Sequence, residues 1–457
     1  MKTDLNEKYV SSLLARLKGI NVNVREPSPN ARASYDGPQP VACFAAGMMS
    51  EVRGFEVSPL DQRTMLEVPD GPRYLCIEGE GFSTLRKLAA EFIAKCELTE
   101  VVSQDFVEDR LFDYRISAFK SDDWSCPIQH MALCVSGVVE ECSFSFPLSG
   151  SRGNRAFFFC GVDFRPDSNE FKEWLKVFRE STDLREHERA ARQRMSEEWK
   201  DNYLQCMWAS ISLTAEPKYA KQVALRQVTE ATHLLRALCV AGYHPTRHVG
   251  LVPGAAFAYG HLTLGSIGGR QTYFSDPAAR TEILWFGEEF LGELNDLGLK
   301  RIDLLYAKES RNEMEDLCLL ALSTLGSVAG MSDVSDKVVY GCTALDLLYS
   351  RKEEPILATM PKRLAIEIGS ELEERKAIVA VIKAVYGLRS GRVHGGQAAE
   401  LNTRTLDFFR YLFYLAGRLP FVAERFSNQS EYINSLEDRM LGGQEPGSSP
   451  RRARPIR

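Results

Sequence analysis

The spacing of apolar positions changes along this chain, and the changes divide it into regions. In the first 180 residues, short apolar runs bounded by polar residues alternate with runs at helical spacing. Strands are expected at residues 73–77, 130–135 and 155–162, and a helix at residues 83–95. This alternation predicts a mixed α/β domain over residues 1–180, which we expect to sense a signal or restrain the rest of the chain.

Helical spacing dominates the remainder of the chain. A helical connector is expected over residues 181–309, interrupted between Tyr243 and Pro277 by a stretch rich in glycine, histidine and aromatic residues that we interpret as an irregular loop. A helical domain is expected over residues 310–441. Residues 442–457 carry four arginines among glycine, serine and proline, which is typical of a disordered basic tail able to touch RNA. The predicted fold class is therefore α+β.

One helix of the C-terminal region ends in a polar motif. From Tyr386 to Gly396 the sequence is Tyr-Gly-Leu-Arg-Ser-Gly-Arg-Val-His-Gly-Gly. Arg389 continues the apolar stripe that precedes it, because it follows at helical spacing the residues Ile378, Ile382 and Val385. A guanidinium keeps its charge and is costly to bury alone, so Arg389 needs an anionic partner.

The histidine of the motif adds a group suited to phosphoryl chemistry. Five residues turn a straight helix by about 140°, so His394 does not share the stripe of Arg389. Gly391 lies between them, and we expect it to break or cap the helix and let His394 fold back beside Arg389. A histidine can move a proton near neutral pH, and an arginine can hold the charged oxygens of a phosphate.

The motif also has a non-catalytic interpretation. Arginine and histidine at similar spacing occur by chance, as at Arg226 and His233, where we expect an uninterrupted helix and interpret the pair as structural. Arg389 itself could pair with an internal carboxylate, such as Asp346 or Glu367, instead of a phosphate. The residue pattern alone leaves both interpretations open.

Three segments together resemble the Apea-like branch of the HEPN superfamily. They are Cys342-Thr-Ala-Leu-Asp-Leu-Leu-Tyr-Ser, Met360-Pro-Lys-Arg-Leu-Ala-Ile-Glu-Ile-Gly-Ser with the Glu-Glu-Arg that follows, and the motif ending in Val-His-Gly-Gly. The resemblance covers about residues 312–435. It implies an all-helical bundle that dimerises, so that the arginine and histidine of each subunit face a shared cleft. Many such proteins are metal-independent RNA endonucleases in anti-phage defence, toxin systems or RNA processing.

The resemblance also assigns roles within the motif. It gives Arg389 to phosphate positioning and His394 to acid–base chemistry, and it places Ser390 where other branches carry asparagine or aspartate. Arg392 and Lys383 are expected either to add phosphate contacts or to be solvated surface cations. The leading hypothesis is an endoribonuclease, with tRNA among its candidate substrates, regulated by the N-terminal domain through a phage or partner-protein trigger. The alternative is a non-catalytic nucleotide-binding, RNA-binding or scaffolding protein.

Composition sets limits on these hypotheses. The net charge of −6 argues against a general polyanion-binding surface, so any RNA contact is expected to be a local basic patch. No apolar run is long enough to span a membrane and the N-terminus is polar, which favours a cytoplasmic protein without a membrane segment. We expect no metal and no cofactor. One metal-like spacing is disfavoured because a strand at 130–135 would turn its cysteine away; it comprises Cys126, His130, Cys134 and Cys142.

Overall fold

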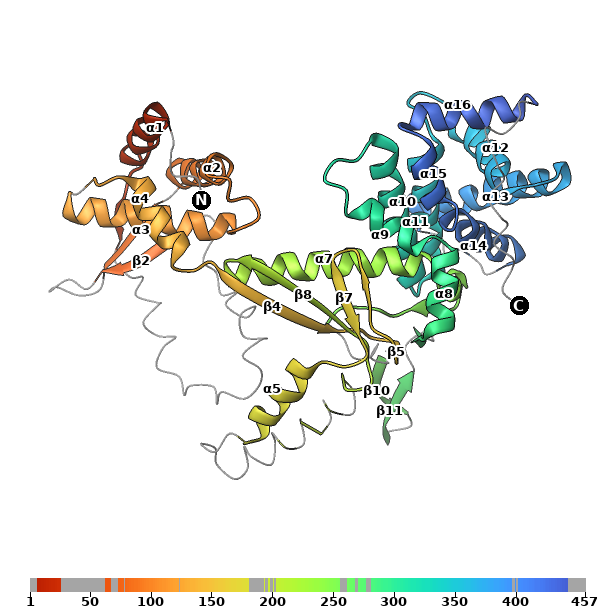
Figure 1. The fold of residues 1–457 in the computed structure, drawn as a ribbon, viewed down its shortest axis with the longest axis horizontal. Coiled ribbons are helices and arrows are strands. Elements are labelled where there is room, and N and C mark those ends of the chain that lie inside the picture. The colour runs from red at the N-terminus through yellow and green to blue at the C-terminus, as the bar shows by residue number, and fades with distance from the viewer. Residues whose placement is uncertain are drawn as a thin grey trace. The chain divides into compact units, whose positions relative to one another are not determined.

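The computed structural model describes residues 6–25, 62–66, 73–77, 79–122, 124–180, 193, 196–197, 200, 203–254, 261–267, 270–276, 281–396, 399 and 402–442. The chain divides into two compact units (Figure 1). One comprises residues 1–142 and 212–223, and the other comprises residues 143–211 and 224–457. The fold class is α+β, as the sequence predicts. The sequence predicts four segments, with boundaries at residues 180, 309 and 441. These boundaries differ from those of the two units, and the four-segment division stays a prediction.

Among its described residues, the N-terminal unit has four complete helices and a small sheet. The helices are α1 (Glu7–Lys18), α2 (Glu80–Lys95), α3 (Gln104–Ser121) and α4 (Pro127–Ser136). The antiparallel sheet has the order β1-β3-β2, with β1 at Asn23–Arg25, β2 at Gln62–Leu66 and β3 at Arg73–Ile77. The helices bury one apolar face each around a common core, whose fully buried members include Leu17, Leu85, Phe92, Leu111 and Met131. The strand expected at 73–77 and the helix expected at 83–95 are confirmed.

The strand expected at residues 130–135 is wrong, because this run lies in α4. Pro127 occupies the first turn of α4, where its missing N–H costs nothing. Ile128, Met131 and Val135 then follow at spacings of three and four and are all buried, which is the pattern of one helix face. A short apolar run fits a strand or a helix equally well, and here packing against the core decides for the helix.

The second unit contains most of a four-stranded sheet of order β4-β8-β7-β6. Its strands are β4 (Glu140–Pro147), β6 (Phe157–Phe159), β7 (Val162–Arg165) and β8 (Trp208–Ala215). The single strand expected at 155–162 is instead β6 followed by a tight turn. Cys160 and Gly161 both have positive φ there, at 51° and 77°, which is the conformation of a two-residue hairpin turn.

Short elements connect this sheet to the C-terminal helices. The helices are α5 (Asn169–Glu180), α7 (Pro217–Ala237), the 3₁₀ turn η2 (Val240–Tyr243), α8 (Glu288–Asp296) and α9 (Leu299–Tyr306). Two parallel pairs join β5 (Ser151–Gly153) to β13 (Leu284–Phe286) and β9 (His248–Val249) to β12 (Thr281–Glu282). Where the sequence predicts an irregular loop, β10 (His261–Ile267) and β11 (Arg270–Asp276) form an antiparallel hairpin.

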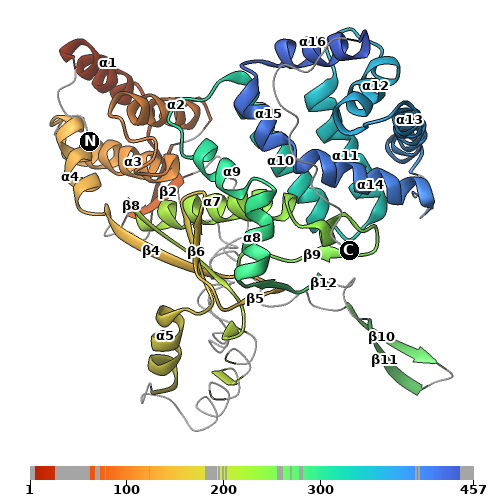
Figure 2. The same ribbon diagram turned by 45° about the vertical axis from the view of Figure 1, so that its right-hand side comes forward.

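Seven helices form the C-terminal part of the described chain (Figure 2). They are α10 (Glu313–Gly330), α11 (Val334–Tyr349), α12 (Ile356–Ile368), α13 (Leu372–Gly395), α14 (Thr403–Ala416), α15 (Leu419–Arg425) and α16 (Gln429–Met440). Side-chain caps begin several of them, as at Asn312, Asp333 and Asn402. Because α11 packs against α10, α12 and α13, and α13 also packs against α14, these helices form one bundle.

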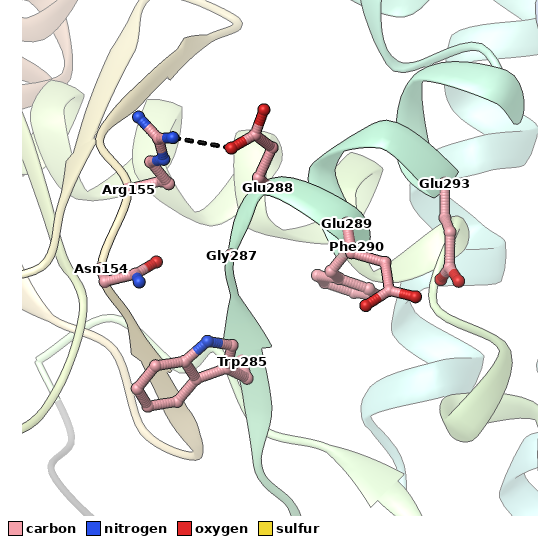
Figure 3. A pocket seen from close by; sticks show the side chains of 8 residues that line it. All are labelled: Asn154, Arg155, Trp285, Gly287, Glu288, Glu289, Phe290 and Glu293. Carbon is pink, nitrogen blue, oxygen red and sulfur yellow. Dashed lines mark hydrogen bonds and ion pairs between the residues drawn. The ribbon is translucent and has the colours of Figure 1, made fainter.

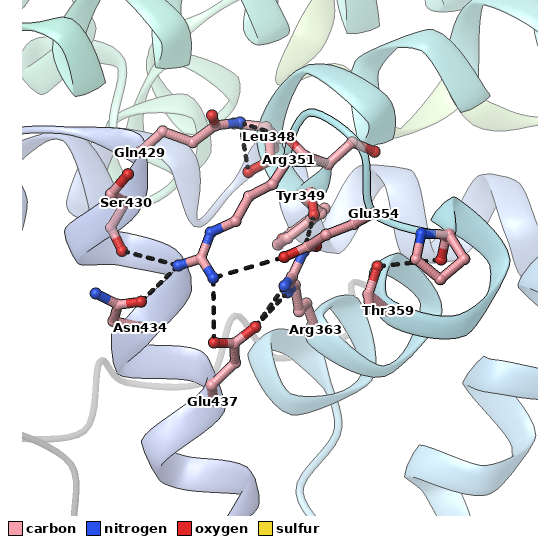
Figure 4. Close-up of polar contacts among 12 residues, drawn as sticks. Leu348, Tyr349, Arg351, Glu354, Thr359, Arg363, Gln429, Ser430, Asn434 and Glu437 are labelled. Carbon is pink, nitrogen blue, oxygen red and sulfur yellow. Dashed lines mark hydrogen bonds and ion pairs between the residues drawn. The ribbon is translucent and has the colours of Figure 1, made fainter.

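A buried arginine fixes the outer helices of this bundle (Figure 4). Arg363 on α12 has 1% of its side chain exposed, and it donates to the Tyr349 carbonyl at 2.7 Å. Its guanidinium also contacts Glu354 at 2.6 Å and the carboxylate of Glu437 on α16. Arg351 reaches the same two carboxylates, at 3.6 and 3.4 Å. The charges compensate one another, so α12 and α16 are held together through ion pairs as well as apolar contacts.

Two further expectations concern a membrane-spanning helix and the C-terminal tail. Within the ranges that the structure describes, no helix is both long enough and apolar enough to cross a bilayer. The basic tail expected at residues 442–457 lies, apart from Gly442, outside the described residues.

Candidate functional site

The motif lies on a single unbroken helix. α13 continues through Gly391 to Gly395, and it ends at Gly396, whose φ of 64° is the left-handed conformation that glycine favours at a helix end. The N–H of Gly396 donates to the carbonyls of Gly391 and Arg392, which closes the last turn. The expected helix break at Gly391 is therefore wrong. A glycine inside a helix costs only about 1 kcal/mol, which the surrounding turns and packing can offset.

The buried stripe of α13 has the spacing that the sequence predicts. Ile378, Ile382 and Val385 have no exposed surface, and Tyr386 retains only 7%. Arg389 continues this face one turn later, but 33% of its side chain is exposed. The arginine thus stands where the buried face of α13 reaches solvent, with one third of its side chain accessible.

Arg389 is held by two residues, one on a neighbouring helix and one on its own. Its Nη2 lies 3.5 Å from Oδ2 of Asp346 on α11, and its guanidinium lies 5.2 Å from the centre of the Tyr386 ring. The Tyr386 hydroxyl donates to the other carboxylate oxygen of Asp346. The Nε of Arg389 is buried and makes no hydrogen bond in the described part of the chain. Asp346 therefore orients the arginine without covering it.

The remaining titratable neighbours stay neutral at physiological pH. Burial, followed by the hydrogen bond to Asp346, raises the pKa of Tyr386 well above its usual value. Burial also raises the pKa of the Cys342 thiol, which lies beneath the pair on α11. Neither group can act as a base at neutral pH. This leaves the guanidinium of Arg389 as the site's positive charge and Asp346 as its orienting partner.

The other motif residues divide between two rows on α13. Arg392 follows Arg389 by one turn, has 38% of its side chain exposed and pairs with Asp336 of α11 at 3.6 Å. We call Arg389 and Arg392 the inner row, since both reach carboxylates of α11. Lys383 and Ser390 are exposed and belong to a different face.

The second face, here called the outer row, is defined by helical spacing. Lys383, Gly387, Ser390 and His394 follow one another at intervals of four, three and four residues. The backbone of His394 belongs to the last turn of α13, and its side chain lies outside the described part. On this unbroken helix, position 394 is turned about 140° from position 389 and lies roughly 7.5 Å further along the axis. The helix alone does not bring Arg389 and His394 together.

The structure distinguishes the two carboxylates that the sequence offers to Arg389. Glu367 is buried and pairs with Arg418 and Arg439, both at 3.4 Å, so it serves a different cluster. Asp346 is the partner. Sequence reasoning missed the hydroxyl of Tyr386, although its position three residues before Arg389 places both on adjacent turns of one side.

The second arginine–histidine pair lies on one unbroken helix, as the sequence predicts, and its structural role stays a prediction. Arg226 and His233 both lie within α7. His233 Nδ1 is 3.4 Å from the Ser327 hydroxyl of α10. Burial, followed by the nearby Arg236, lowers the pKa of His233 to about 4. This histidine therefore stays neutral near pH 7.

The cysteine-rich segment forms no metal site that the structure describes. His130 Nε2 and Cys134 Sγ lie 3.6 Å apart, one turn from each other on α4. Among the described side chains, no group of three or more histidine, cysteine, aspartate or glutamate residues is close enough to share an ion. The contact between His130 and Cys134 is therefore a weak hydrogen bond of one helix face.

A pocket of about 500 Å³ lies elsewhere in the same unit as the motif, beside the start of α8 (Figure 3). Its lining residues are Asn154, Arg155, Trp285, Gly287, Glu288, Glu289, Phe290 and Glu293. Three glutamates and one arginine line it, and Arg155 is already paired with Glu288 at 2.7 Å. Negative charge of this kind repels phosphate, and no motif residue lines the pocket, so it is a poor site for RNA.

Comparison with protein-family models, with curated proteins and with solved structures gave no match to this chain.

Proposed function

We propose that this protein is a metal-independent endoribonuclease whose site is the C-terminal end of α13. The observation that carries the proposal is the partly exposed side chain of Arg389, whose guanidinium Asp346 and Tyr386 orient on the helix that also bears His394. An oriented arginine that remains one-third exposed is suited to receive a phosphodiester. The resemblance to HEPN nucleases supports the same assignment.

The chemistry follows from the two side chains. Arg389 holds the non-bridging oxygens of the scissile phosphate and stabilises the charge that develops on them. His394 takes the proton of the ribose 2′-hydroxyl, whose oxygen attacks phosphorus and displaces the 5′-oxygen. The departing oxygen takes up a proton, from a second histidine or from water. The products are a 2′,3′-cyclic phosphate and a free 5′-hydroxyl.

The unbroken helix favours a composite site in a dimer. Because positions 389 and 394 of one helix are turned about 140° apart, a phosphate held by Arg389 is better reached by the partner subunit's His394. The dimer implied by the resemblance would provide this arrangement. In it, Arg392 and Lys383 would contact flanking phosphates and Ser390 would border the cleaved bond. The substrate would be RNA, with tRNA a candidate, and the biological setting would be prokaryotic defence or toxicity triggered through the N-terminal unit.

The test is cleavage of total RNA and tRNA in excess EDTA by the full-length protein. We expect Arg389→Ala and His394→Ala each to abolish cleavage while leaving the circular dichroism spectrum unchanged. The matched control is Arg410→Ala, since Arg410 is an exposed arginine of α14 that pairs with Asp407 at 3.0 Å. Loss of activity in the control, or retained activity in either motif variant, would refute the assignment. Mixing the two inactive variants should restore part of the activity if the site is shared between subunits.

A second candidate function is a non-catalytic nucleotide-binding, RNA-binding or scaffolding role. The pairing of Arg389 with the internal carboxylate of Asp346 favours it, because a satisfied ion pair needs no ligand. This alternative predicts that the wild-type protein cleaves no RNA and is not toxic when expressed. It also predicts that His394→Ala leaves RNA or nucleotide binding unchanged, which a binding titration of both proteins would measure.

A further inference from the structure

The N-terminal unit contains a buried arginine that has no anionic partner among the residues that the structure describes. Arg115 of α3 is 6% exposed. Its Nε and Nη2 both donate to the carbonyl of Ile20, just beyond the end of α1, at 3.1 and 2.7 Å. The third nitrogen, Nη1, is buried and has no hydrogen-bond partner among the described residues. One carbonyl oxygen thus serves a group that carries five N–H donors and a full charge.

No described acid compensates the charge of Arg115. No carboxylate forms an ion pair with it in the described part of the chain, and its other neighbours are the rings of Phe119 and Trp124, at 5.7 and 5.1 Å. Burial lowers the pKa of its guanidinium. An arginine nevertheless stays protonated near neutral pH. A buried cation of this kind is costly unless an anion accompanies it.

A second cation contacts the same aromatic ring. The ammonium of Lys18, in the last turn of α1, lies 5.0 Å from the centre of the Trp124 ring that Arg115 also contacts. Lys18 is exposed and forms no ion pair in the described part, whereas Arg16, two residues earlier, pairs with Glu91 at 2.6 Å. Figure 2 shows α1, α3 and α4 gathered in this unit. In the sequence, Trp124 lies in the segment between α3 and α4. Trp124 is half-buried and Lys18 is exposed, so both reach solvent, whereas Nη1 of Arg115 is itself buried.

We propose that the N-terminal unit binds a phosphate group between Lys18 and Arg115, beside Trp124. The free Nη1 of Arg115 would donate one charge-assisted hydrogen bond to it, and the ammonium of Lys18 would donate another. Two cations suit a dianion such as a phosphate monoester better than a single carboxylate. The group could come from inorganic phosphate or from a mononucleotide. This site is separate from the motif on α13 and does not depend on the proposed cleavage activity.

The test is calorimetric titration of the full-length protein with inorganic phosphate and with adenosine monophosphate, against potassium chloride at equal ionic strength. The variants are Lys18→Ala and Arg115→Met, and Arg16→Ala is the matched control from the same helix. We expect phosphate to bind the wild type and the control equally. Lys18→Ala should weaken binding by about tenfold or more, the effect of losing one charge-assisted hydrogen bond. Arg115→Met should abolish binding without lowering the melting temperature in phosphate-free buffer, since it removes a buried charge that no described acid compensates.

The outcomes separate cleanly. Tighter binding of the mononucleotide than of phosphate would identify a nucleotide as the ligand, and equal binding would identify the phosphate group alone. Absence of binding to the wild type would overturn the proposal, as would binding that Lys18→Ala leaves unchanged. If Arg115→Met fails to fold, the comparison of Lys18→Ala with Arg16→Ala decides by itself.

Discussion

The ion pair between Arg389 and Asp346 is expected to contribute little to stability, and this weakness is what leaves the arginine free for a substrate. The perturbation is a double-mutant cycle that combines Asp346→Asn with Arg389→Gln. Asparagine keeps an oxygen that can accept the Tyr386 hydroxyl, so the cycle removes the charge interaction and leaves that hydrogen bond in place. The two singles and the double then give the coupling free energy of the pair.

The magnitude follows from the geometry. The closest N–O distance is 3.5 Å, and the two side chains are 33% and 22% exposed, so solvent screens the pair. Accessible pairs of this kind contribute about 0.2–1 kcal/mol. The ion pair of Arg363 with Glu437 gives the contrast within the same bundle, because Arg363 is only 1% exposed. Glu437 is 38% exposed, so breaking this half-buried pair is expected to cost less than the about 3–5 kcal/mol of a fully buried one.

The assay is urea unfolding followed by circular dichroism, with hydrogen exchange of α11 and α13 peptides to assign the effect to this bundle. We expect a coupling free energy below about 1 kcal/mol for Asp346 and Arg389, and a several-fold larger value for Glu437→Gln combined with Arg363→Met. A coupling above about 2 kcal/mol for the first pair would refute the reasoning. Arg389 would then be a structural residue, in agreement with the non-catalytic alternative.

Three further predictions concern residues that support the bundle. Folding lowers the pKa of His233 from 6.5 to about 4, so the contribution of this histidine to stability should be complete above pH 6.5. The free energy of unfolding should fall by up to about 3 kcal/mol as the pH falls to 4, and His233→Gln should flatten that dependence in acid titrations. Gly326→Ala should cost about 3 kcal/mol or more in urea unfolding, since its new Cβ would lie 1.8 Å from a backbone oxygen of α7. The new Cβ of Gly387→Ala would meet nothing within 4 Å, so this substitution should stabilise α13 by up to about 1 kcal/mol. Lys337→Met should cost about 2–4 kcal/mol and increase hydrogen exchange after η2, because its buried ammonium donates to three backbone carbonyls; unchanged exchange there would contradict this role.

Helical periodicity was enough to predict much of the site's own helix. The apolar stripe of Ile378, Ile382 and Val385 is fully buried as its spacing indicates, and Arg389 stands at its end. Periodicity did not predict that Gly391 lies inside the helix. Glycine has a weak helix preference, but Gly391 stays helical because helical turns form on both sides of it. The histidine's relation to the arginine therefore differs from the one expected.

The sequence by itself determined the α+β class, the helices around the motif and the motif's residues, because these depend on composition and on spacings of a few positions. The tertiary structure decided which carboxylate meets Arg389, since Asp346 lies 43 residues away on α11 and nothing local separates it from Glu367. It also decided that residues 130–135 are helical and that Arg115 is buried beside Lys18. The physical reason is the same each time. Burial and charge pairing bring together residues that are distant in sequence, and the spacing of residues within a short segment does not identify those partners.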